Sequence, residues 1–487
     1  MLLTKLLSDF EDRLPDKDYE ISDIVYDSRK AYEGSLFVCL KGFNTDGHTF
    51  AKSAYDRGCR VFLAEKDLYL PDDACTVLVE NTRAALPLIS AQFFGHPEKK
   101  LKLIGITGTK GKTTTTKLIR DILTAGGYNT ATIGTNGIYI NHDHIPTVNT
   151  TPESFELYKA FDRMVRENVD ICVLEVSSQA YLTHRVDSLT FDIGVFTNIA
   201  HDHIGAGEHP DFENYLECKA RLFENSRLAV FNLDDKHYTD MRKFAKCPAL
   251  SYSIDTHTDY TASLIKEYKT DTCLGISFEC NTVTGTIPIT LKMPGRFNVY
   301  NALAAIAVAK RLGIRDDIIS SALKSSTVEG RFEIIDALPS STVIIDYAHN
   351  GYSMQNLLET VRRYSPRRLV VLFGSVGSRT EIRRKELGDV CARLADFCVI
   401  TSDNPDFEEP EKIIEDIEKS FVGTSTPYIT IADREEAIKY VIKNACVGDV
   451  IVLAGKGHEK YQLVRGEHIP FIERDIVLRE AELISVK

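Results

Sequence analysis

Short hydrophobic runs alternate with longer amphipathic segments over most of this chain, from about residue 101 onward. The runs have the length of β-strands, whereas the segments between them repeat their hydrophobic residues at the three- and four-residue spacing of an α-helix. Alternation of this kind is typical of a parallel sheet covered by helices, and it predicts an α/β fold. The runs are Leu101–Ile106, Asp170–Leu174, Phe191–Phe196, Val343–Ile345, Leu369–Phe373, Phe397–Ile400 and Val450–Leu453.

Each of these hydrophobic runs stops at a polar or glycine-rich cluster. In open α/β sheets, ligands bind beyond the carboxyl ends of the strands, so we expect the clusters to face a common cleft. The clusters begin at Thr107, Glu175, Thr197, Asp346, Gly374, Thr401 and Ala454. Residues 257–292 show β-type segments and turn signals without a helical pattern, and they predict a small antiparallel insertion.

Two breaks in the pattern divide the chain. Its 487 residues correspond to about three domains of roughly 150 residues each. Gly95–Lys100 places helix-breaking residues and charge before the first hydrophobic run, and Thr327–Arg331 separates a helical pattern from renewed strand patterns. We predict a smaller N-terminal α/β domain, a central parallel-sheet domain and a C-terminal Rossmann-like α/β domain. Their predicted bounds are residues 1–98, 99–330 and 331–487.

Composition narrows the classes of protein to which this fold can belong. Hydrophobic residues make up 43% of the chain and charged residues 26%, as in soluble globular proteins, and no run of 18 apolar residues predicts a membrane span. The 70 acidic residues exceed the 58 Lys and Arg residues, and the formal charge of −12 argues against binding to nucleic acid or an anionic membrane. The eleven cysteines contain no CxxC pair and the N-terminus does not resemble a signal peptide, so we expect a cytoplasmic protein.

The strongest local motif is the glycine-rich segment Gly105–Thr114, which reads GITGTKGKTT. It follows a predicted strand and precedes a predicted helix, as a phosphate-binding loop requires. Backbone N–H groups at the helix start would hold phosphates, Lys112 would reach the β- and γ-phosphates, and the Thr113 hydroxyl would bind Mg²⁺. Ile106 stands where the strict GxxxxGK[ST] pattern has its first glycine. The alternative is a glycine-rich turn with a chance lysine. Because it contains this phosphate-binding loop, the central domain is predicted to be an ATPase domain.

Two further strand ends carry candidate metal ligands. Glu175 ends a hydrophobic run and could order Mg²⁺ beside the loop, although a solvated strand-end glutamate is the alternative. His201, His203 and His209 follow another run and raise the alternative of zinc. No cysteine partner and no HExxH spacing accompany them, so we favour a magnesium shell that includes one histidine.

The remaining polar clusters are weaker individually than together. Asn298 and Asn301 begin an alanine-rich helix, where helix capping alone would explain them. The clusters Asp346–His349, Asp403–Asp406 and Gly455–Glu459 follow predicted strands, where polar loops are common. Their position at one predicted edge favours a shared site.

Taken in order, these motifs resemble the Mur ligase family, the ATP-dependent ligases of bacterial peptidoglycan synthesis. The resemblance covers nearly the full chain, and it is strongest to the members that add the third amino acid to UDP-N-acetylmuramoyl-L-Ala-D-Glu. The matching motifs are Tyr26–Arg29, Gly108–Thr113, Thr150–Pro152, Glu175–Ser178, Thr183–Arg185, Asp202–His203, Lys219, Phe297–Asn301, Asp346–His349, Asp403–Pro405 and Gly455–Glu459.

The resemblance implies a role for each matching position. The UDP-sugar and its peptide would contact Ser28, Asn44, Thr45, Thr150, Thr151, Ser177 and Arg185. ATP would contact Gly108, Thr109, Lys110, Gly111, Lys112, Thr113, Thr114, Asn298, Asn301, Arg331, Asp346 and His349. Mg²⁺ would be held by Thr113, Glu175, His203 and a carbamylated Lys219, and the implied catalytic residues are Lys112, Lys219, His203 and Glu175. The amino acid would contact Arg379, Asp403, Asn404, Asp406, Gly455 and Glu459.

Two of these assignments go beyond simple matching. The sequence alone predicts Lys219 to be a surface lysine on a helix, and its carbamylation rests on the resemblance. Family members that add meso-diaminopimelate usually read Asp-Asn-Pro-Arg, where the arginine holds the distal carboxylate, but this chain has Asp406 at the fourth position. An acidic residue would repel that carboxylate, so we predict L-lysine, with ornithine or diaminopimelate as alternatives.

The implied reaction is amide formation through an acyl phosphate. The D-glutamyl γ-carboxylate would attack the γ-phosphate of ATP, and the amine of the amino acid would then displace phosphate. The implied partners are UDP-N-acetylmuramoyl-L-Ala-D-Glu, ATP with Mg²⁺, and an amino acid, and we expect a monomer. A folylpolyglutamate-synthase-like ligase is the first alternative, although it has no use for the N-terminal 95 or so residues. A nucleotide-dependent switch is the second, although no Asn-Lys-x-Asp motif is present.

Overall fold

The computed structural model describes residues 1–13, 17–43, 45–201, 204–205, 208–270, 274–377 and 381–485, and every structural statement below refers to these residues. They form two compact units. Unit 1 consists of Met1–Thr261 and Tyr300–Ile319, and unit 2 of Ala262–Val299 and Ser320–Lys487. The α/β fold class is confirmed, whereas the three domain boundaries stay predictions.

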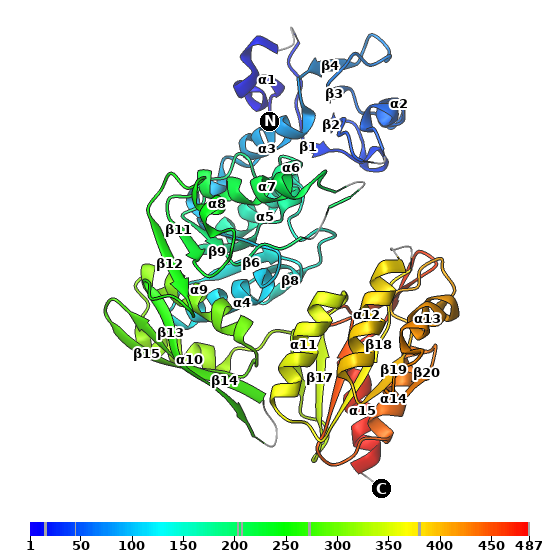
Figure 1. Ribbon diagram of the computed structural model, residues 1–487. Helices are drawn as coiled ribbons and strands as arrows, with labels where there is room; N and C mark the ends of the chain where they lie inside the picture. Colours follow the sequence, from blue (N-terminus) through cyan, green and yellow to red (C-terminus); the bar gives the residue numbers. More distant parts are fainter. Residues whose placement is uncertain are drawn as a thin grey trace. The chain divides into compact units, whose positions relative to one another are not determined.

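The N-terminal part of unit 1 is a four-stranded parallel sheet with order β1-β2-β3-β4 (Figure 1). Its elements are α1 (Leu3–Leu6), η1 (Ser8–Arg13), β1 (Asp23–Val25), η2 (Ser28–Lys30), β2 (Ser35–Val38), η3 (Gly47–Phe50), α2 (Ala51–Asp56), β3 (Val61–Ala64), β4 (Cys75–Leu78), α3 (Thr82–Phe94) and η4 (Pro97–Lys100). Aromatic packing joins this part to the rest of unit 1, because Phe93 and Phe94 on α3 contact Phe155.

The second sheet has the order β15-β14-β13-β12-β11-β10-β5-β9-β6-β7-β8. Its strands are β5 (Lys102–Thr107), β6 (Thr130–Gly134), β7 (Gly137–Ile140), β8 (Asp143–Ile145), β9 (Ile171–Glu175), β10 (Ile193–Phe196), β11 (Ala229–Asn232), β12 (Ala249–Ser253), β13 (Tyr260–Lys269), β14 (Leu274–Thr282) and β15 (Gly285–Leu291). The helices of this region are α4 (Lys112–Ala125), α5 (Ser154–Arg166), α6 (Ser178–Leu182), α7 (Phe212–Glu224), α8 (Tyr238–Arg242), α9 (Arg296–Arg311) and α10 (Asp316–Ser325).

The position of β5 in this sheet fixes the place of the candidate site. β5 pairs in parallel with β10 on one side and with β9 on the other. After β5 the chain crosses through α4 to β6, and it returns later to the opposite side of β5 to form β10. A reversal of strand order opens a crevice at the carboxyl ends of the strands, and the segment after β5 therefore lies at that crevice.

The antiparallel segment predicted at residues 257–292 is confirmed as β13, β14 and β15, with β14 and β15 antiparallel. The segment lengthens the edge of the second sheet, because the start of β13 pairs in parallel with β12. Within unit 2, its strand β14 also meets the C-terminal α/β region. There Leu274 is buried in the same hydrophobic core as α11, and the Tyr364 hydroxyl donates to the Gly275 carbonyl at 2.8 Å.

The C-terminal sheet in unit 2 has the order β16-β17-β21-β18-β19-β20 and is parallel except for β16. Its strands are β16 (Glu333–Ile335), β17 (Thr342–Asp346), β18 (Arg368–Phe373), β19 (Phe397–Ile400), β20 (Tyr428–Thr430) and β21 (Asp449–Ala454), and the hairpin β22 (Tyr461–Val464) and β23 (Glu467–Pro470) follows. The helices are α11 (Gly351–Arg363), α12 (Glu381–Leu394), α13 (Pro410–Glu418), η5 (Lys419–Phe421), α14 (Arg434–Lys443) and α15 (Glu473–Ser485).

Alternate residues of these strands face opposite layers of helices. Val371 belongs to the core shared with α11, α12 and α13, whereas its neighbours Val370 and Leu372 belong to the core shared with α14 and α15 (Figure 1). Both faces of the sheet are buried, which explains why its strands are continuous hydrophobic runs. This arrangement confirms the predicted Rossmann-like C-terminal region.

The seven predicted runs all form strands, but they lie in two sheets. Three of them are β5, β9 and β10 of the second sheet, and four are β17, β18, β19 and β21 of the C-terminal sheet. The polar strand ends therefore belong to two groups, one in each unit, and the common cleft stays a prediction.

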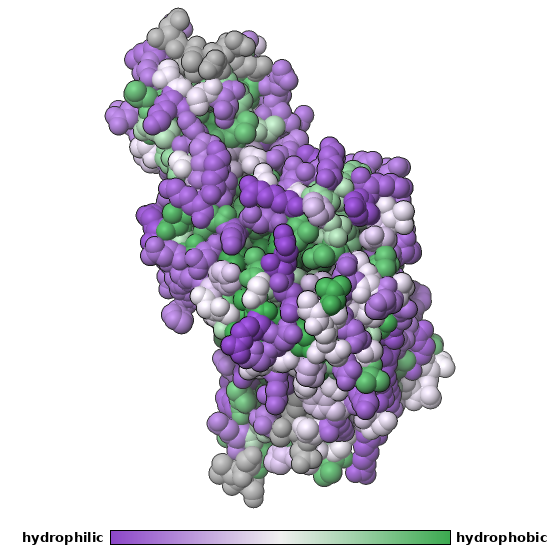
Figure 2. Space-filling view, turned by 90° about the vertical axis from the view of Figure 1, so that its left-hand side faces the viewer, coloured by the Kyte–Doolittle hydropathy of each residue, from purple (hydrophilic) through white to green (hydrophobic). Residues whose placement is uncertain are grey.

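The described part of the chain contains no helix that is both long and apolar enough to cross a membrane. On the face drawn in Figure 2, hydrophilic side chains are spread over the surface with hydrophobic ones among them. Ten cysteines are described and all carry free thiols, most of them buried.

Core packing in the C-terminal sheet gives the first testable prediction. We expect Val371→Ala to lower the free energy of unfolding of this sheet by about 2 kcal/mol, because the fully buried side chain loses two methyl groups and leaves a cavity. The measurement is native-state hydrogen exchange in β17 to β19. Val422→Ala is the matched control, because Val422 is 83% exposed. Equal effects of the two substitutions would contradict the packing described here.

Candidate active site

The phosphate-loop candidate connects β5 to the first turn of α4 in unit 1. Gly108 and Gly111 have φ values of 152° and 86°, which favour glycine. A Cβ atom would overlap the Thr197 hydroxyl at Gly108 and the Asn301 side-chain oxygen at Gly111. Both glycines are therefore required by conformation and by space, and the loop closes against α4 as the sequence predicts.

A second strand end braces this loop. The side-chain oxygen of Asn198, just after β10, accepts from the Lys110 backbone N–H at 3.0 Å. The Thr197 hydroxyl donates to the Lys110 carbonyl at 2.7 Å, and the Thr109 N–H donates to the Asn198 carbonyl at 2.8 Å. These bonds fix the loop before any ligand arrives. The helix that it begins carries Thr114, which is buried.

Two lysines direct their ammonium groups to one carbonyl of the loop. Lys112 Nζ lies 2.7 Å from the Gly108 carbonyl oxygen, and Lys219 Nζ on α7 lies 2.9 Å from the same atom. Lys219 is 2% exposed and lies over the Tyr215 ring, so the prediction of a surface lysine was wrong. Together with the N-terminus of α4, the two lysines make this pocket strongly attractive to anions.

Glu175 at the end of β9 supplies the negative charge of the site. Its carboxylate accepts from the Thr113 hydroxyl at 3.0 Å and from the backbone and side chain of Thr135 at 3.2 and 3.1 Å. Burial raises the pKa of Glu175, while the Lys112 charge and these hydrogen bonds act in the opposite direction. The Tyr215 hydroxyl lies 3.0 Å from the Thr109 hydroxyl and so joins α7 to the loop.

The donor set fits a magnesium ion. Thr113 and Glu175 provide hard oxygen atoms next to the anion pocket, and Mg²⁺ commonly takes one or two protein oxygens and completes its shell with water and phosphate. No group of three or more His, Cys, Asp and Glu side chains suitable for a metal occurs in the described part of the chain. The zinc alternative at His201, His203 and His209 involves a residue outside the described ones and is not tested, whereas Thr113 and Glu175 are compatible with a sparse magnesium shell.

A polar cluster beside Glu175 contains four predicted substrate contacts. The Thr151 hydroxyl donates to the Glu175 carbonyl at 2.8 Å and lies 3.2 Å from the Ser177 hydroxyl. Arg185 donates to the Thr151 carbonyl at 2.8 Å, and the Thr150 hydroxyl lies 3.1 Å from that of Thr135. The structure thus brings Thr150, Thr151, Ser177 and Arg185 together next to the phosphate loop.

Three residues of this neighbourhood, Arg83, Glu153 and Glu156, were not predicted from the sequence. Glu153 pairs with Arg185 at 2.9 Å and with Arg83 of the N-terminal part at 3.4 Å. Tyr26, just after β1, hydrogen-bonds to the half-buried Glu156 on α5, and burial raises the pKa of both groups. The motif Tyr26–Arg29 is thereby fixed against the Arg185 neighbourhood, with Ser28 buried and Thr45 exposed.

In unit 2, three predicted ATP contacts gather at the end of β17. The Asp346 carboxylate accepts from the backbone N–H groups of Phe332 and Ala348 at 2.7 and 2.8 Å, and burial raises its pKa. Arg331 lies over the Tyr347 ring, and the His349 ring packs against the same tyrosine. Asn298 is buried and donates to the Pro294 carbonyl at 2.8 Å, whereas Asn301 in unit 1 faces Gly111 and Thr115.

The segment before β16 is fastened to the loop after β21. A Cβ atom at Gly330 would overlap the backbone N of His458, and one at Gly457 would lie 2.7 Å from the Gly330 carbonyl oxygen. The His458 ring packs on Tyr347 in the same place. Burial, with the charges of Arg331, Lys460 and His349, lowers the pKa of His458 to about 3, so its imidazole is neutral at neutral pH.

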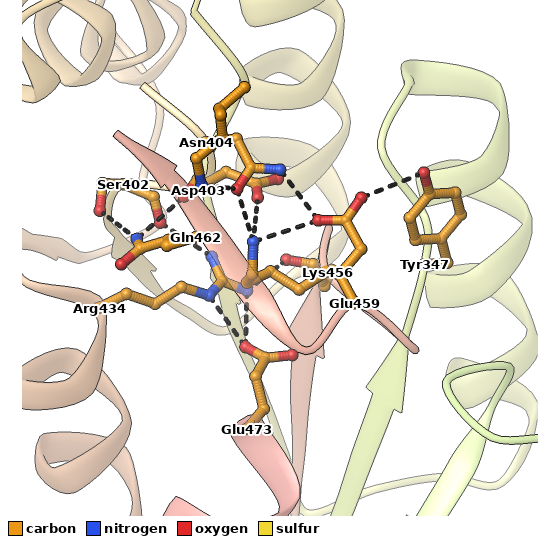
Figure 3. A network of polar contacts seen from close by, with 11 residues as sticks. Tyr347, Ser402, Asp403, Asn404, Arg434, Lys456, Glu459, Gln462 and Glu473 are labelled. Carbon is orange, nitrogen blue, oxygen red and sulfur yellow. Dashed lines mark hydrogen bonds and ion pairs between the residues drawn. The ribbon is translucent and has the colours of Figure 1, made fainter. Parts of the chain in front are cut away.

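The predicted amino-acid contacts Asp403, Asn404, Gly455 and Glu459 also come together in unit 2 (Figure 3). Asn404 lies after β19 and donates to the Glu459 carboxylate at 2.9 Å. Gly455 has a φ of 115°, and a Cβ atom there would lie 2.6 Å from the Asp403 carboxylate. The centre of the group is the fully buried Lys456, which lies in the predicted motif Gly455–Glu459 but had no predicted role.

Asp406 has a local structural role. Its carboxylate accepts from the Gly466 backbone N–H at 2.8 Å, in the turn between β22 and β23. Its backbone also pairs with Leu463 and Arg465, at 3.0 and 2.8 Å. The hydrogen bond to the hairpin turn accounts for one oxygen of this carboxylate. The predicted contacts Asn44, His203 and Arg379 lie outside the described residues.

A phosphate loop at a strand-order reversal, with a buried acidic residue on the neighbouring strand, defines a nucleotide-binding protein of the phosphate-loop class. Comparisons with known proteins narrow this class. The Mur ligase family, catalytic domain, matches residues 20–93, the Mur ligase middle domain matches residues 106–309, and the Mur ligase, glutamate ligase domain, matches residues 330–457.

Two curated relatives match almost end to end. The UDP-N-acetylmuramoyl-L-alanyl-D-glutamate–2,6-diaminopimelate ligase of Caldanaerobacter subterraneus is 42% identical and covers 94% of each chain. The ligase of the same name from Clostridium perfringens is 38% identical over 98% of this chain and 99% of its own length. A solved structure with this name has a TM-score of 0.70 and 27% identity, and covers 99% of both chains. The Thermotoga maritima MurF ligase in complex with ADP has a TM-score of 0.65 at 20% identity, covering 96% of this chain and 98% of its own, and supports the fold alone.

The chain belongs to the Mur ligase family. Members of this family are ATP-dependent ligases that require Mg²⁺, and the phosphate loop with Thr113 and Glu175 agrees with this activity. The prediction of the lysine-adding type is not supported, because these relatives are named as diaminopimelate ligases. The main sequence argument for lysine was Asp406, whose carboxylate hydrogen-bonds to the hairpin turn.

The fit of Gly111 against Asn301 gives the second prediction. We expect Gly111→Ala to weaken ATP binding by roughly tenfold or more, because the added methyl group displaces Asn301 and shifts the N–H groups at the start of α4. Binding of ATP by titration calorimetry is the measurement. Gly127→Ala is the matched control, since Gly127 has a similar φ of 92° at the other end of α4 but no atom within 4 Å of the added group. An unchanged affinity of Gly111→Ala would contradict the assignment of the loop.

Proposed function

We propose that this protein joins meso-diaminopimelate to the D-glutamyl γ-carboxylate of UDP-N-acetylmuramoyl-L-Ala-D-Glu, with ATP converted to ADP and phosphate, as a step of peptidoglycan synthesis. The single observation that carries the proposal is nearly full-length similarity, at 38 to 42% identity, to relatives named for that reaction. The clustered loop, acidic strand end and polar pockets support it. Lysine remains the second candidate, because position 406 lacks the arginine that the resemblance associates with diaminopimelate.

The phosphate loop supports the first chemical step. A carboxylate oxygen of D-glutamate attacks the γ-phosphorus of ATP, the bond from phosphorus to the β,γ-bridging oxygen breaks, and an acyl phosphate and ADP result. Lys112 would stabilise the charge on the phosphoryl oxygens, and the α4 N-terminus would hold the phosphates. Mg²⁺, held by Thr113 and Glu175, would supply further charge neutralisation when bound.

The second step forms the amide bond. The neutral amine attacks the acyl carbon, the tetrahedral intermediate expels inorganic phosphate, and the amine gives up one proton. The Asp403, Asn404 and Glu459 group carries the acidic and amide oxygens that an ammonium group of the amino acid would contact before this step. We also propose that residues 1–98, 99–330 and 331–487 bind the nucleotide sugar, ATP and the amino acid respectively.

The third prediction concerns the substrate. We expect release of ADP with UDP-N-acetylmuramoyl-L-Ala-D-Glu and meso-diaminopimelate, and at least tenfold lower kcat/KM with L-lysine or ornithine, which lack the distal carboxylate. A coupled assay of ADP measures all three amino acids at one ATP concentration. Omission of the UDP-dipeptide is the control. Preference for lysine would overturn the diaminopimelate assignment, and release independent of any amino acid would overturn the ligase proposal.

The fourth prediction concerns Lys219. We propose that its side chain reacts with CO₂ to form a carbamate, because a carbamate would replace a buried cation by oxygen ligands for Mg²⁺ beside Lys112. We expect Lys219→Ala to abolish ADP release and a short carboxylic acid such as acetate to restore part of it. Lys243→Ala, at an exposed lysine, is the control and keeps wild-type activity. Full activity of Lys219→Ala would reject this role.

A further inference from the structure

The centre of the polar group in unit 2 is a lysine that is entirely enclosed by protein. Lys456 is 0% exposed (Figure 3). It lies two residues after the last residue of β21, and Gly455 stands between them. Lysine is seldom fully buried without partners, because removing its ammonium group from water is costly. We therefore expect the ammonium group of Lys456 to have a specific role in this site.

Lys456 lies among the side chains of two strand-end loops. Its Nζ atom lies 2.8 Å from the Asn404 side-chain oxygen, 3.2 Å from Glu459 Oε2 and 3.4 Å from Asp403 Oδ1. Asp403 and Asn404 follow β19, whereas Glu459 follows β21. One ammonium group thus holds the polar ends of two neighbouring loops together.

The contact with Lys456 fixes the orientation of the Asn404 amide. The Asn404 oxygen accepts from Lys456 and also from the Leu463 backbone N–H at 2.9 Å. The amide nitrogen is thereby turned toward Glu459, to which it donates at 2.9 Å. A rotated amide would place its NH₂ group against two donors, so Lys456 selects a single arrangement of Asn404 and Glu459.

The charges within this group do not balance. Among the described residues of this group, Lys456 contributes one positive charge against the two carboxylates of Asp403 and Glu459, and this balance favours a second cation. The other charged neighbours form their own pair, because the buried Arg434 contacts Glu473 at 2.9 Å. The Tyr461 ring also lies near the Lys456 ammonium group, and the Tyr347 hydroxyl donates to Glu459 at 3.4 Å. An ammonium group of a ligand is the chemistry that completes the balance.

We infer that Lys456 is a positioning residue, which orients the Asn404 amide and the Glu459 side chain toward an ammonium group of the incoming amino acid. The inference rests on the proposed function and assigns to this site a residue that touches no reacting atom. Arg434 binds the backbone of the same two loops, because it donates to the Ser402 and Ala454 carbonyls at 3.1 and 2.8 Å. These bonds do not involve Lys456.

The test compares the same substitution at two lysines of one loop. We expect Lys456→Met to raise KM for the amino acid roughly 10- to 100-fold, because Asn404 and Glu459 lose their orientation, while KM for ATP and for the UDP-dipeptide stays within about twofold. Lys460→Met is the matched control. Lys460 is 56% exposed, pairs with Glu329 at 3.3 Å and is expected to leave all three KM values unchanged.

A pH profile separates positioning from general stabilisation of the loop. Without Lys456, the neighbouring Asp403 and Glu459 carboxylates lose the cation that stabilises their charged form. We expect the acid limb of kcat/KM for the amino acid to move upward by about one pH unit or more in Lys456→Met and not in Lys460→Met. Loss that is equal at every pH and for every substrate would show a merely structural lysine and overturn the inference.

The remaining outcomes are also decisive. Wild-type KM for the amino acid in Lys456→Met overturns this inference and leaves the proposed function intact. A wild-type protein that neither turns over nor binds diaminopimelate or lysine in a calorimetric titration overturns both. If Lys456→Met fails to fold, Lys456→Arg, which keeps the charge but replaces the compact ammonium group between Asn404 and Glu459, must show the selective rise in KM.

Discussion

The ammonium groups of two lysines contact a single carbonyl oxygen, that of Gly108. The candidate site in unit 1 depends on how these two positive charges are compensated. Lys112 comes from the helix that the loop begins, whereas Lys219 comes from α7, more than one hundred residues later. Like charges at this separation repel, and the adjacent helix N-terminus adds to the positive potential. The buried Glu175 offsets part of it, and a bound polyphosphate would offset the rest.

Strand order is what makes this convergence possible. β9 brings Glu175 to one side of β5, and β10 brings Thr197 and Asn198 to the other, so that three strand ends surround one loop. In unit 2 the ends of β19 and β21 are likewise joined through side chains, although their strands are separated by β18. In both units the chemistry is assembled from loops, while the sheets supply the fixed positions from which the loops project.

The sequence predicted well those features that depend on local pattern. The strands, the helix after Lys112 and the need for Gly108 and Gly111 follow from hydrophobic spacing and from the geometry of a strand–loop–helix turn. The burial of Lys219 was not predicted because a lysine was expected to face solvent, although the exposed Glu213, Glu217 and Glu224 share one side of α7 and Lys219 lies on the opposite side. No role was predicted for Lys456, Thr135 and Glu153, because their partners come from segments far away in the sequence. The lysine prediction from Asp406 is not supported by the relatives, and the hydrogen bond of its carboxylate to the β22–β23 turn leaves no trace in a four-residue motif.

The close approach of Gly330 to Gly457 and His458 has a mechanical consequence. Backbone touches backbone there without side chains between them, so neither segment can shift alone without opening a gap or creating an overlap. The loop that carries Glu459 and the stretch that leads into β16 therefore behave as one rigid piece. A displacement of the stretch before β16 would therefore also move the loop that carries Glu459, and the reverse holds as well.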